Sequence, residues 1–388
     1  MISGGRRQGE EVRAFNIMIK PASSACNMAC GYCFYRDIAG NRDVADRGML
    51  SLDRMERLVA NALADADVYC GFVFQGGEPT LAGLDFFRAV VEFQRRHNTR
   101  GTRVENFIQT NGYCVDGDWA DFFRENSFLV GLSLDGPAEV HNSNRVDHGG
   151  GGTFNRVMNA MHVLRERGAE FNVLSVVTGQ NARRIASIYR FFMKHEVRHL
   201  QFIPCLEPLE ARRGDADWHL SSEEYGRYLI RVFDLWFEDL RKGRYTSVRH
   251  IDNWLSILLG NRPEACSMTG RCSVQYVVEG DGGVYPCDFY VYDEWCLGSV
   301  DDSFDELGRG ETARRFVDAS LAVPERCRAC PWAGLCRNGC RRDRLPPEGG
   351  GVAVNFYCPS LRAFFEARIG AMREACSILR RMQAGNLG

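Results

Sequence analysis

The stretch AFNIMIKPASSACNMACGYCFY, residues 14–35, decides the fold because it joins an apolar run directly to three closely spaced cysteines. Residues 14–20 have the length and apolar character of a buried β-strand. Cys26, Cys30 and Cys33 follow the strand, and the next cysteine is Cys70. A strand followed by a loop of reactive side chains is typical of folds whose active groups lie at the carboxyl ends of parallel strands.

The number of thiols in this loop limits the kinds of site that it can form. A structural zinc site closes a tetrahedron with four Cys or His ligands, so three cysteines without a nearby fourth fit it poorly. An odd count also fits disulfide pairing poorly, and the polar N-terminal residues 1–15 contain no apolar export signal. The three cysteines therefore suggest a metal site with one open position.

Composition sets broader limits on function. A chain of 388 residues exceeds the usual size of one hydrophobic core, so two or three domains are expected. The formal charge of −2 provides no positive field for a phosphate backbone, and no run of about 18 apolar residues is present, so neither nucleic acid nor a membrane is an expected partner. The 16 cysteines favour a reducing, cytoplasmic location and metal or redox chemistry.

Six strand-then-helix units can be followed as far as residue 242. The apolar runs that predict strands are residues 14–20, 71–75, 104–110, 128–134, 171–177 and 200–203. Apolar positions that recur every three or four residues predict helices at 51–66, 83–97, 153–167, 181–195 and 222–241. The alternation predicts parallel strands with helices outside, and six units suit a partial (β/α)6 barrel of the TIM type.

Polar, glycine-containing sequences follow several of the predicted strands. QGGEP at 75–79 follows the second strand, QTNG at 109–112 the third, and SLDGP at 133–137 the fourth, with Arg145 a little beyond. One glycine pair alone is also the ordinary composition of a turn. Because the loops after parallel strands share one rim of a barrel, all these sequences are expected to meet the cysteine loop there.

The combination of motifs resembles the radical S-adenosylmethionine superfamily. The resemblance rests on CX3CX2C at residues 26–33, with Tyr32 before the third cysteine, and on GGEP after the second strand. It implies that the three thiolates hold a [4Fe-4S] cluster whose fourth iron binds S-adenosylmethionine, which explains the open position.

The same resemblance assigns the other contacts of this cofactor. The backbone around Gly76, Gly77 and Glu78 would bind its amino group, and Ser133 and Arg145 would reach its ribose and carboxylate. A helix cap for Ser133 and a solvated ion pair for Arg145 remain the alternative roles.

A second cysteine-rich region, where ten of the 16 cysteines lie, runs from Cys266 to Cys376. Its spacing resembles the SPASM extension, in which CX9–15GX4C is followed by CX2CX5CX3C and one more cysteine. By this resemblance the region binds two further [4Fe-4S] clusters, three in all, and two zinc knuckles are the alternative reading of the spacing. The implied ligands are Cys266, Cys272, Cys287 and Cys340 for one cluster, and Cys327, Cys330, Cys336 and Cys358 for the other.

These assignments divide the chain into four parts. We expect a radical S-adenosylmethionine partial barrel at 14–242, a linker helix at 243–262, a SPASM domain at 263–365 and a C-terminal helix at 360–384. Of the remaining cysteines, Cys70 and Cys114 flank barrel strands and are assigned to packing, because free cysteine is commonly a small buried apolar residue.

The sequence is similar in particular to anaerobic sulfatase-maturating enzymes, above all in GGVYPCDFYV at 282–291. That family oxidises a cysteine or serine in an unfolded sulfatase segment to Cα-formylglycine, through a 5'-deoxyadenosyl radical that abstracts hydrogen from the substrate Cβ. The similarity implies an unfolded sulfatase peptide or nascent chain as substrate, and a flavodoxin- or ferredoxin-type reductant.

The proposed oxidation needs a group that accepts a proton. Asp288, next to Cys287, is the candidate catalytic base, and a turn aspartate that caps local backbone is its alternative role. By the same similarity Tyr35 and Gln75 are candidate peptide contacts. Tyr35 could equally cover the cluster, and Gln75 could equally satisfy backbone groups at a strand end.

Two other functions stay open at this point. A SPASM maturase that forms thioether or carbon–carbon crosslinks in a ribosomal peptide would share every predicted cluster ligand. A non-catalytic iron–sulfur electron carrier or a zinc-dependent scaffold would not cleave the cofactor, and a scaffold would hold zinc in place of about twelve irons.

Overall fold

Ten strands form one continuous sheet in the order β10-β9-β8-β1-β2-β3-β4-β5-β6-β7. The computed structural model describes residues 13–209, 212–347 and 350–385. Neighbouring strands from β1 to β7 are parallel, β8 is parallel to β1, and the β8–β9 and β9–β10 pairs are antiparallel. The strands are β1 Ala14–Ile19, β2 Tyr69–Phe74, β3 Arg103–Thr110, β4 Phe128–Ser133, β5 Phe171–Val177, β6 His199–Pro204, β7 Ser247–Val248, β8 Val277–Val278, β9 Gly283–Tyr285 and β10 Gly298–Ser299.

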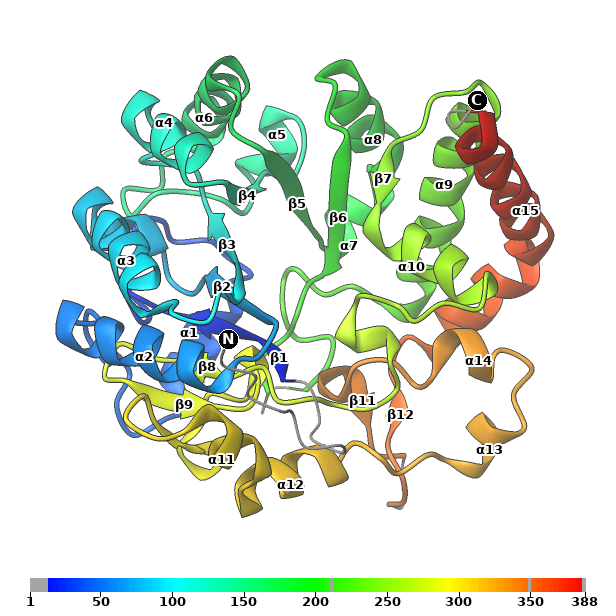
Figure 1. Cartoon of the computed structure of the whole chain (residues 1–388). Helices are drawn as coiled ribbons and strands as arrows, with labels where there is room; N and C mark the ends of the chain where they lie inside the picture. The colour runs from blue at the N-terminus through cyan, green and yellow to red at the C-terminus, as the bar shows by residue number, and fades with distance from the viewer. Residues whose placement is uncertain (1–12, 210–211, 348–349, 386–388) are drawn as a thin grey trace.

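Helices cover the outer side of the curved sheet (Figure 1). In the barrel they are α1 Phe34–Gly40, α2 Leu52–Asp65, α3 Leu84–His97, α4 Gly117–Glu125, α5 Ala138–His141, α6 Phe154–Arg167, α7 Gly179–Arg183, α8 Ile185–Lys194 and α9 Ser222–Arg241. Further along the chain they are α10 Arg249–Leu258, α11 Phe304–Arg309, α12 Glu311–Asp318, α13 Glu325–Arg328, α14 Ala333–Cys336 and α15 Cys358–Gly385. No described helix has the length and apolar character needed to cross a membrane.

The predicted partial barrel is confirmed, and each of its six strands agrees with the prediction to within two residues at either end. The predicted helix at 181–195 is instead two helices, because the Thr178 side chain caps α7 and a break at Arg184 separates it from α8. The segment predicted as a linker helix, 243–262, contains the short strand β7 as well as α10. Residues 1–12, on which most of the export-signal prediction rests, lie outside the described residues.

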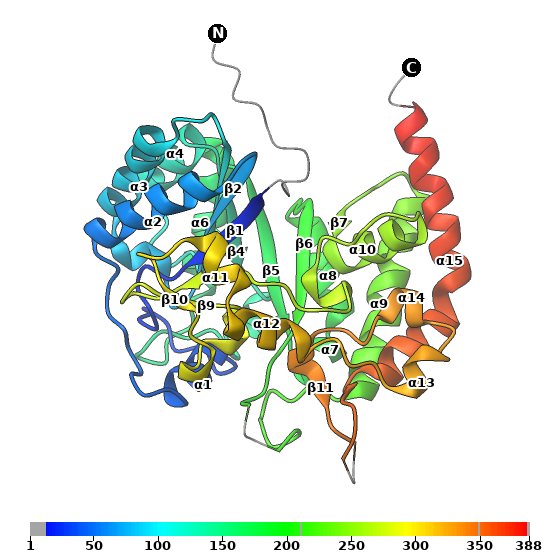
Figure 2. The same ribbon diagram turned by 60° about the horizontal axis from the view of Figure 1, so that its bottom comes forward.

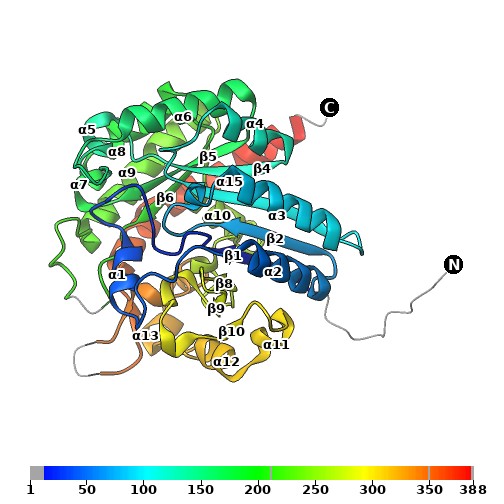
Figure 3. The same ribbon diagram turned by 90° about the vertical axis from the view of Figure 1, so that its left-hand side faces the viewer.

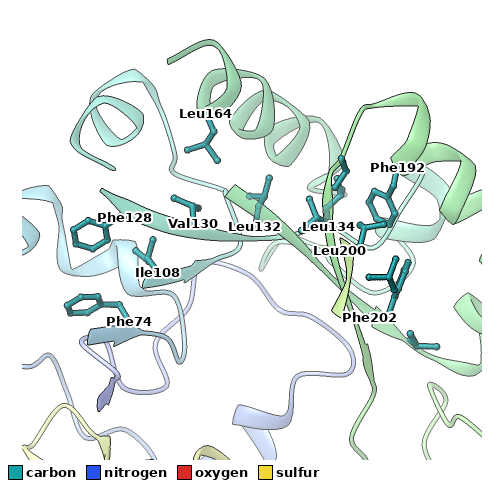
Figure 4. Packing of buried hydrophobic residues seen from close by; sticks show 14 of the residues in the cluster. Phe74, Ile108, Phe128, Val130, Leu132, Leu134, Leu164, Phe192, Leu200 and Phe202 are labelled. Atoms are coloured by element: carbon teal, nitrogen blue, oxygen red, sulfur yellow. The ribbon is translucent and has the colours of Figure 1, made fainter. Parts of the chain in front are cut away.

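Apolar side chains of the strands and of the covering helices pack together between the sheet and those helices (Figure 4). Phe74 of β2, Phe87 of α3 and Phe128 of β4 are fully or almost fully buried. The ring centroids of Phe74 and Phe87 lie 5.0 Å apart in an edge-to-face arrangement, which favours aromatic pairs beyond the burial of their area. This packing fixes the strands whose carboxyl ends carry the predicted site.

The long helix α15 packs along α9 at one side of the barrel (Figure 1). Phe364 of α15 meets Phe233 of α9 edge to face at 5.7 Å between centroids, and Arg368 pairs with Asp234 at 2.6 Å. The predicted C-terminal helix begins at Cys358 and not at residue 360 as expected. This cysteine is thus the first residue of the helix.

Three strands of the cysteine-rich region continue the barrel sheet (Figure 3). Met18 and Ile19 of β1 pair with Val277 and Val278 of β8, and β9 and β10 extend the sheet beyond them. β1 consequently lies inside the sheet, between β2 and β8.

A second contact joins the two regions near the loop that follows β6. This loop and the hairpin of β11 (Arg344–Leu345) and β12 (Val354–Asn355) extend from the same side of the molecule (Figure 2). Arg342 donates to the Glu207 carbonyl at 2.8 Å, and Arg213 pairs with Asp343 at 3.2 Å. The cysteine-rich region thus contacts the barrel at strand β1 and again at the loop after β6.

Candidate active site

The loop that carries Cys26, Cys30 and Cys33 follows β1 and is held by the segment after β4. Backbone hydrogen bonds join Ala29 N to Val146 O at 2.8 Å and Gly31 N to Asn144 O at 2.9 Å. Burial raises the pKa of Cys26 to about 12, and the neighbouring thiols Cys30 and Cys33 add to the rise. Near neutral pH such thiols keep their protons unless a metal binds them, because the metal ligand is the deprotonated thiolate.

The GGEP turn packs directly against this cysteine loop. Glu78 N donates to the Ala25 carbonyl at 2.8 Å. Gly77 has a φ of 49°, and a Cβ there would lie 2.2 Å from the Ala25 carbonyl oxygen, so only glycine fits. The structure therefore brings two of the predicted motifs together at the end of β1.

The fully buried side chain of Glu78 joins the GGEP turn to the QTNG loop. Its carboxylate accepts four hydrogen bonds, from the Thr80 amide and hydroxyl, the Thr110 hydroxyl at 2.8 Å and the Asn111 amide at 2.8 Å. Burial raises the pKa of Glu78, and these hydrogen bonds oppose the rise. The side chain thus organises the site from within, which leaves the surrounding backbone as the part available to a cofactor.

Asn111 is a site residue that the sequence did not single out, although its QTNG motif was noted. Its side-chain amide donates to Cys26 Sγ at 3.6 Å and to Asn27 Oδ1 at 2.7 Å. Hydrogen bonds to ligand sulfurs are among the features that set the potential of an iron–sulfur cluster.

Ser133 and Arg145 lie on the same rim, and neither has its alternative role. Ser133 caps no described helix, and its hydroxyl accepts a hydrogen bond from Gln109 at 2.9 Å. Arg145 is buried and pairs with the buried Asp135 at 3.2 Å, so the ion pair is not solvated. Tyr32 also donates to Asp135 and stacks under the Arg145 guanidinium.

Tyr35, Gln75 and Asp288, predicted from three distant motifs, meet at one point. The Tyr35 hydroxyl donates to Asp288 Oδ2 at 2.7 Å, and the Gln75 amide donates to the same oxygen at 3.2 Å and to the Tyr35 oxygen at 2.9 Å. Lys20, which the sequence did not single out, pairs with Asp288 Oδ1 at 3.0 Å. Asp288 begins a short 3-10 turn, Asp288–Tyr290, but no side-chain cap of local backbone is found there.

Four of the predicted ligands line one hollow of ≈ 40 Å³ beside Asp288. They are Cys266, Cys272, Cys287 and Cys340, together with aromatic and arginine side chains that include Phe289, Tyr290, Phe316 and Arg341. Burial raises the pKa of Cys340 to about 12. No three described Cys, His, Asp or Glu side chains converge closely enough to hold a single metal ion, so these thiols stand around a space rather than a point.

Comparisons with known proteins match the two regions separately and the chain as a whole. Residues 21–192 match the Radical SAM superfamily, and residues 266–331 match the iron-sulfur cluster-binding domain SPASM. The cysteine-type anaerobic sulfatase-maturating enzyme of Clostridium novyi is 45% identical over 362 residues, which cover 93% of this chain and 97% of that protein.

The chain belongs to the anaerobic sulfatase-maturating enzyme family. A serine-type member from Bacteroides thetaiotaomicron is 30% identical over 369 residues, with 90% of this chain and 88% of that protein covered. The solved structure of native anSMEcpe with bound AdoMet and Cp18Cys peptide superposes with a TM-score of 0.90 at 41% identity, over 95% of this chain and 100% of that one. Streptococcus suis SuiB bound to precursor peptide SuiA shares the fold, with a TM-score of 0.62 at 15% identity over 85% of this chain and 72% of that one.

The remaining predicted ligands of this radical S-adenosylmethionine enzyme also form a set. Burial raises the pKa of Cys336 to about 11, and the nearby thiols Cys358, Cys327 and Cys330 add to the rise. These thiols come from α13, α14, α15 and the turn between α13 and α14. Both four-cysteine sets have the all-sulfur composition that suits [4Fe-4S] clusters in this family.

Two cysteines that the sequence assigned to packing differ in their surroundings. Cys70 in β2 is fully buried, as predicted. The prediction is wrong for Cys114, which is exposed and accepts a hydrogen bond from Asn27 at 3.2 Å. Cys114 thus lies on the surface beside the cysteine loop, to which Asn27 belongs, and not in the core.

Proposed function

We propose that this chain oxidises a cysteine in an unfolded sulfatase segment to Cα-formylglycine. The single observation that carries the proposal is the meeting of Tyr35, Gln75 and Asp288 beside Cys287, one of the four thiols that line the hollow. A carboxylate with two neutral donors, next to a set of cluster-type thiols, offers a proton acceptor beside an electron acceptor. Both are needed when a thiol-bearing carbon is oxidised.

S-adenosylmethionine, when bound at a reduced iron–sulfur cluster, would supply the radical chemistry that removes one hydrogen atom from the substrate Cβ. Cys26, Cys30 and Cys33 would hold that cluster. The backbone of Gly76, Gly77 and Glu78 would bind the amino group of the cofactor. Ser133 would contact its ribose and Arg145 its carboxylate.

The contacts of the last two residues support these assignments. Within the described chain, Arg145 makes a single ion pair, through Nε, which leaves its two terminal nitrogens able to bind a carboxylate in a bidentate manner. Ser133 Oγ accepts from Gln109 and keeps its own hydrogen for a further acceptor.

Asp288, which is hydrogen-bonded to Tyr35 and Gln75, would remove the proton of the substrate thiol. After hydrogen abstraction the substrate must lose this proton and one electron to become a thioaldehyde, and water then replaces sulfur to give the aldehyde. Cys266, Cys272, Cys287 and Cys340 would hold the cluster that accepts the electron, and Cys327, Cys330, Cys336 and Cys358 a third cluster. In all, the chain would bind three [4Fe-4S] clusters.

Cysteine is favoured over serine as the oxidised residue because the relatives divide by identity. Relatives named cysteine-type are 44–45% identical to this chain, whereas those named serine-type are 28–30% identical. A flavodoxin- or ferredoxin-type protein would supply electrons, and a cytoplasmic location would give access to the sulfatase before it folds.

The decisive experiment is anaerobic turnover of a matched pair of sulfatase-derived peptides that differ only in Cys or Ser at the target position. We expect formylglycine from the Cys peptide, seen by mass spectrometry as the exchange of sulfur and two hydrogens for oxygen, together with 5'-deoxyadenosine. A product that loses two hydrogens and keeps sulfur would show a crosslinking maturase instead. Absence of cofactor cleavage in the reduced protein would show an electron carrier.

A further inference from the structure

Lys20 is a buried lysine whose ammonium group faces the Asp288 carboxylate. It follows β1 directly, and its side chain is 1% exposed. Nζ lies 3.0 Å from Asp288 Oδ1 and 4.6 Å from the centroid of the Tyr35 ring. The lysine therefore touches two of the three residues that meet at the site.

Burial of a lone ammonium group is costly, so Lys20 needs anionic partners. A second carboxylate, Glu279, lies 3.6 Å from Nζ. Glu279 has other donors, because Arg42 reaches it at 2.7 Å and the Ser23 hydroxyl at 2.8 Å. Lys20, in contrast, is the one described cation that pairs with Asp288.

The two carboxylate oxygens of Asp288 consequently have different partners. Oδ1 faces Lys20, whereas Oδ2 accepts from Tyr35 and Gln75. A half turn of the carboxylate only exchanges two equivalent oxygens, whereas any smaller rotation of its plane would weaken or break all three contacts. An ionic contact on one oxygen thus fixes the direction in which the other oxygen points.

The glycine turn of GGEP provides the space that Lys20 occupies. Gly76 has a φ of 94°, and a Cβ at this position would lie 2.5 Å from Lys20 Cγ and 2.7 Å from Cδ. The lysine stem therefore passes against the backbone of the turn on its way to Asp288. This arrangement gives Gly76 a steric role in addition to any contact with a cofactor.

We propose that Lys20 is a positioning residue for Asp288, which it holds by Oδ1 so that Oδ2 stays with Tyr35 and Gln75, where the peptide thiol is oxidised. The inference rests on the proposed function for the identity of the product. It predicts that loss of the ammonium group leaves hydrogen abstraction intact and impairs the step that follows it.

The test compares Lys20→Met with wild type and with Lys194→Met, a control at the exposed end of α8. We expect normal iron content and normal 5'-deoxyadenosine formation for Lys20→Met, with a fall of about tenfold to a hundredfold in formylglycine per 5'-deoxyadenosine. The KM for the peptide should stay within about twofold, because the substrate-binding donors remain. We call the ratio of formylglycine to 5'-deoxyadenosine the coupling. Unchanged coupling in Lys20→Met would overturn the proposal.

A double variant separates action through Asp288 from independent damage. Lys20→Met combined with Asp288→Asn should couple no worse than Asp288→Asn alone, whereas a further fall would contradict the proposal. Lys20→Gln, which keeps a hydrogen-bond donor without the charge, should lie between wild type and Lys20→Met. Loss of iron from both Lys20 variants would assign the lysine to the fold alone and would also overturn the proposal.

The ratio of product to 5'-deoxyadenosine tests the role of Lys20 separately from the proposed function. If wild type made a crosslink in place of formylglycine, the proposed function would fail, and the ratio of that crosslink to 5'-deoxyadenosine would still test Lys20. If wild type made formylglycine and Lys20→Met coupled normally, only the role of Lys20 would be refuted.

Discussion

The Tyr35 hydroxyl and the Asp288 carboxylate are hydrogen-bonded at 2.7 Å although 253 positions separate them in the sequence. Tyr35 lies in α1, which begins directly after Cys33, and Asp288 follows Cys287. One hydrogen bond thus connects the loop of the first cysteine set with the hollow of the second. The predictions below test this connection and the parts of the structure that support it.

Asp288→Asn should still cleave S-adenosylmethionine and should make little formylglycine. The amide keeps the shape of the side chain and removes its ability to accept a proton, so a loss of about a hundredfold or more is expected. The measurement counts 5'-deoxyadenosine and aldehyde in the same reaction. A wild-type yield of aldehyde would exclude Asp288 as the base.

Tyr35→Phe removes one donor from Asp288 and retains the ring that stacks near Lys20. We expect the coupling of aldehyde to 5'-deoxyadenosine to fall by less than in Asp288→Asn, because Gln75 still holds Oδ2. The free energy of unfolding should change by only about 1 kcal/mol, the usual net contribution of a hydrogen bond. A change in the KM for the peptide with normal coupling would instead indicate a contact with the peptide.

The two four-cysteine sets predict a specific pattern of iron loss. Cys340→Ala and Cys336→Ala should each lower the iron content from about twelve to about eight per chain. The pair Cys340→Ala/Cys272→Ala should lose no more iron than Cys340→Ala, because both thiols line one hollow, whereas Cys340→Ala/Cys336→Ala should retain about four irons. Cys70→Ala serves as the control, and equal losses from both pairs would contradict the grouping.

Glu78→Gln should destabilise the site through its internal hydrogen bonds. The amide nitrogen of glutamine would face either the Asn111 amide or the three donors at Oε1, so at least one buried donor would lose its acceptor. The expected cost is about 1–3 kcal/mol, measured as a lower thermal midpoint. Weakened cofactor binding without any loss of stability would mean that the carboxylate contacts the cofactor directly.

Acid should weaken the fold through His250, a half-buried histidine packed among aromatic rings. Burial lowers the pKa of His250 to about 4, and its Nε2 has no hydrogen-bond partner among the described residues. An unfolded chain binds a proton at this histidine below a pKa of about 6.5 and the folded chain does not, so stability falls as the pH drops from about 6.5 to 4.

His250→Phe should remove this dependence, since the site is lined by the rings of Phe202, Tyr228 and Trp254. Between pH 7.5 and 5 the variant should lose about 2 kcal/mol less stability than wild type in urea unfolding followed by circular dichroism. His162→Gln, at an exposed histidine, is the control. Equal losses in His250→Phe and wild type would show that His250 binds a proton as readily in the folded chain as in the unfolded one.

The elements that the sequence predicted well are those with strong local patterns. Strands β2 to β6 contain enough apolar residues to be recognised in the sequence, whereas the division of the cysteines into ligand sets came from the family resemblance. Strands β8 to β10 have two or three residues each, too few for any periodicity, so the extension of the sheet was not predicted.

Lys20 escaped prediction for a different reason. A single lysine at the end of a strand usually lies in solvent, and nothing near position 20 indicates burial. Its partners Glu279 and Asp288 are brought to it only by the pairing of β8 with β1. Cys114 shows the reverse case, because it was expected to be buried as a free cysteine that flanks a barrel strand, and it is exposed.

The interior position of β1 in the sheet limits where this enzyme can be divided into independent parts. With β2 on one edge and β8 on the other, removal of the cysteine-rich segment would strip β1 of a backbone partner and expose an apolar strand edge to aggregation. The cysteine-rich segment therefore cannot be deleted, or exchanged between homologues, at the boundary that its cysteines suggest. A functional chimera would have to carry β1 and its lysine along with the segment.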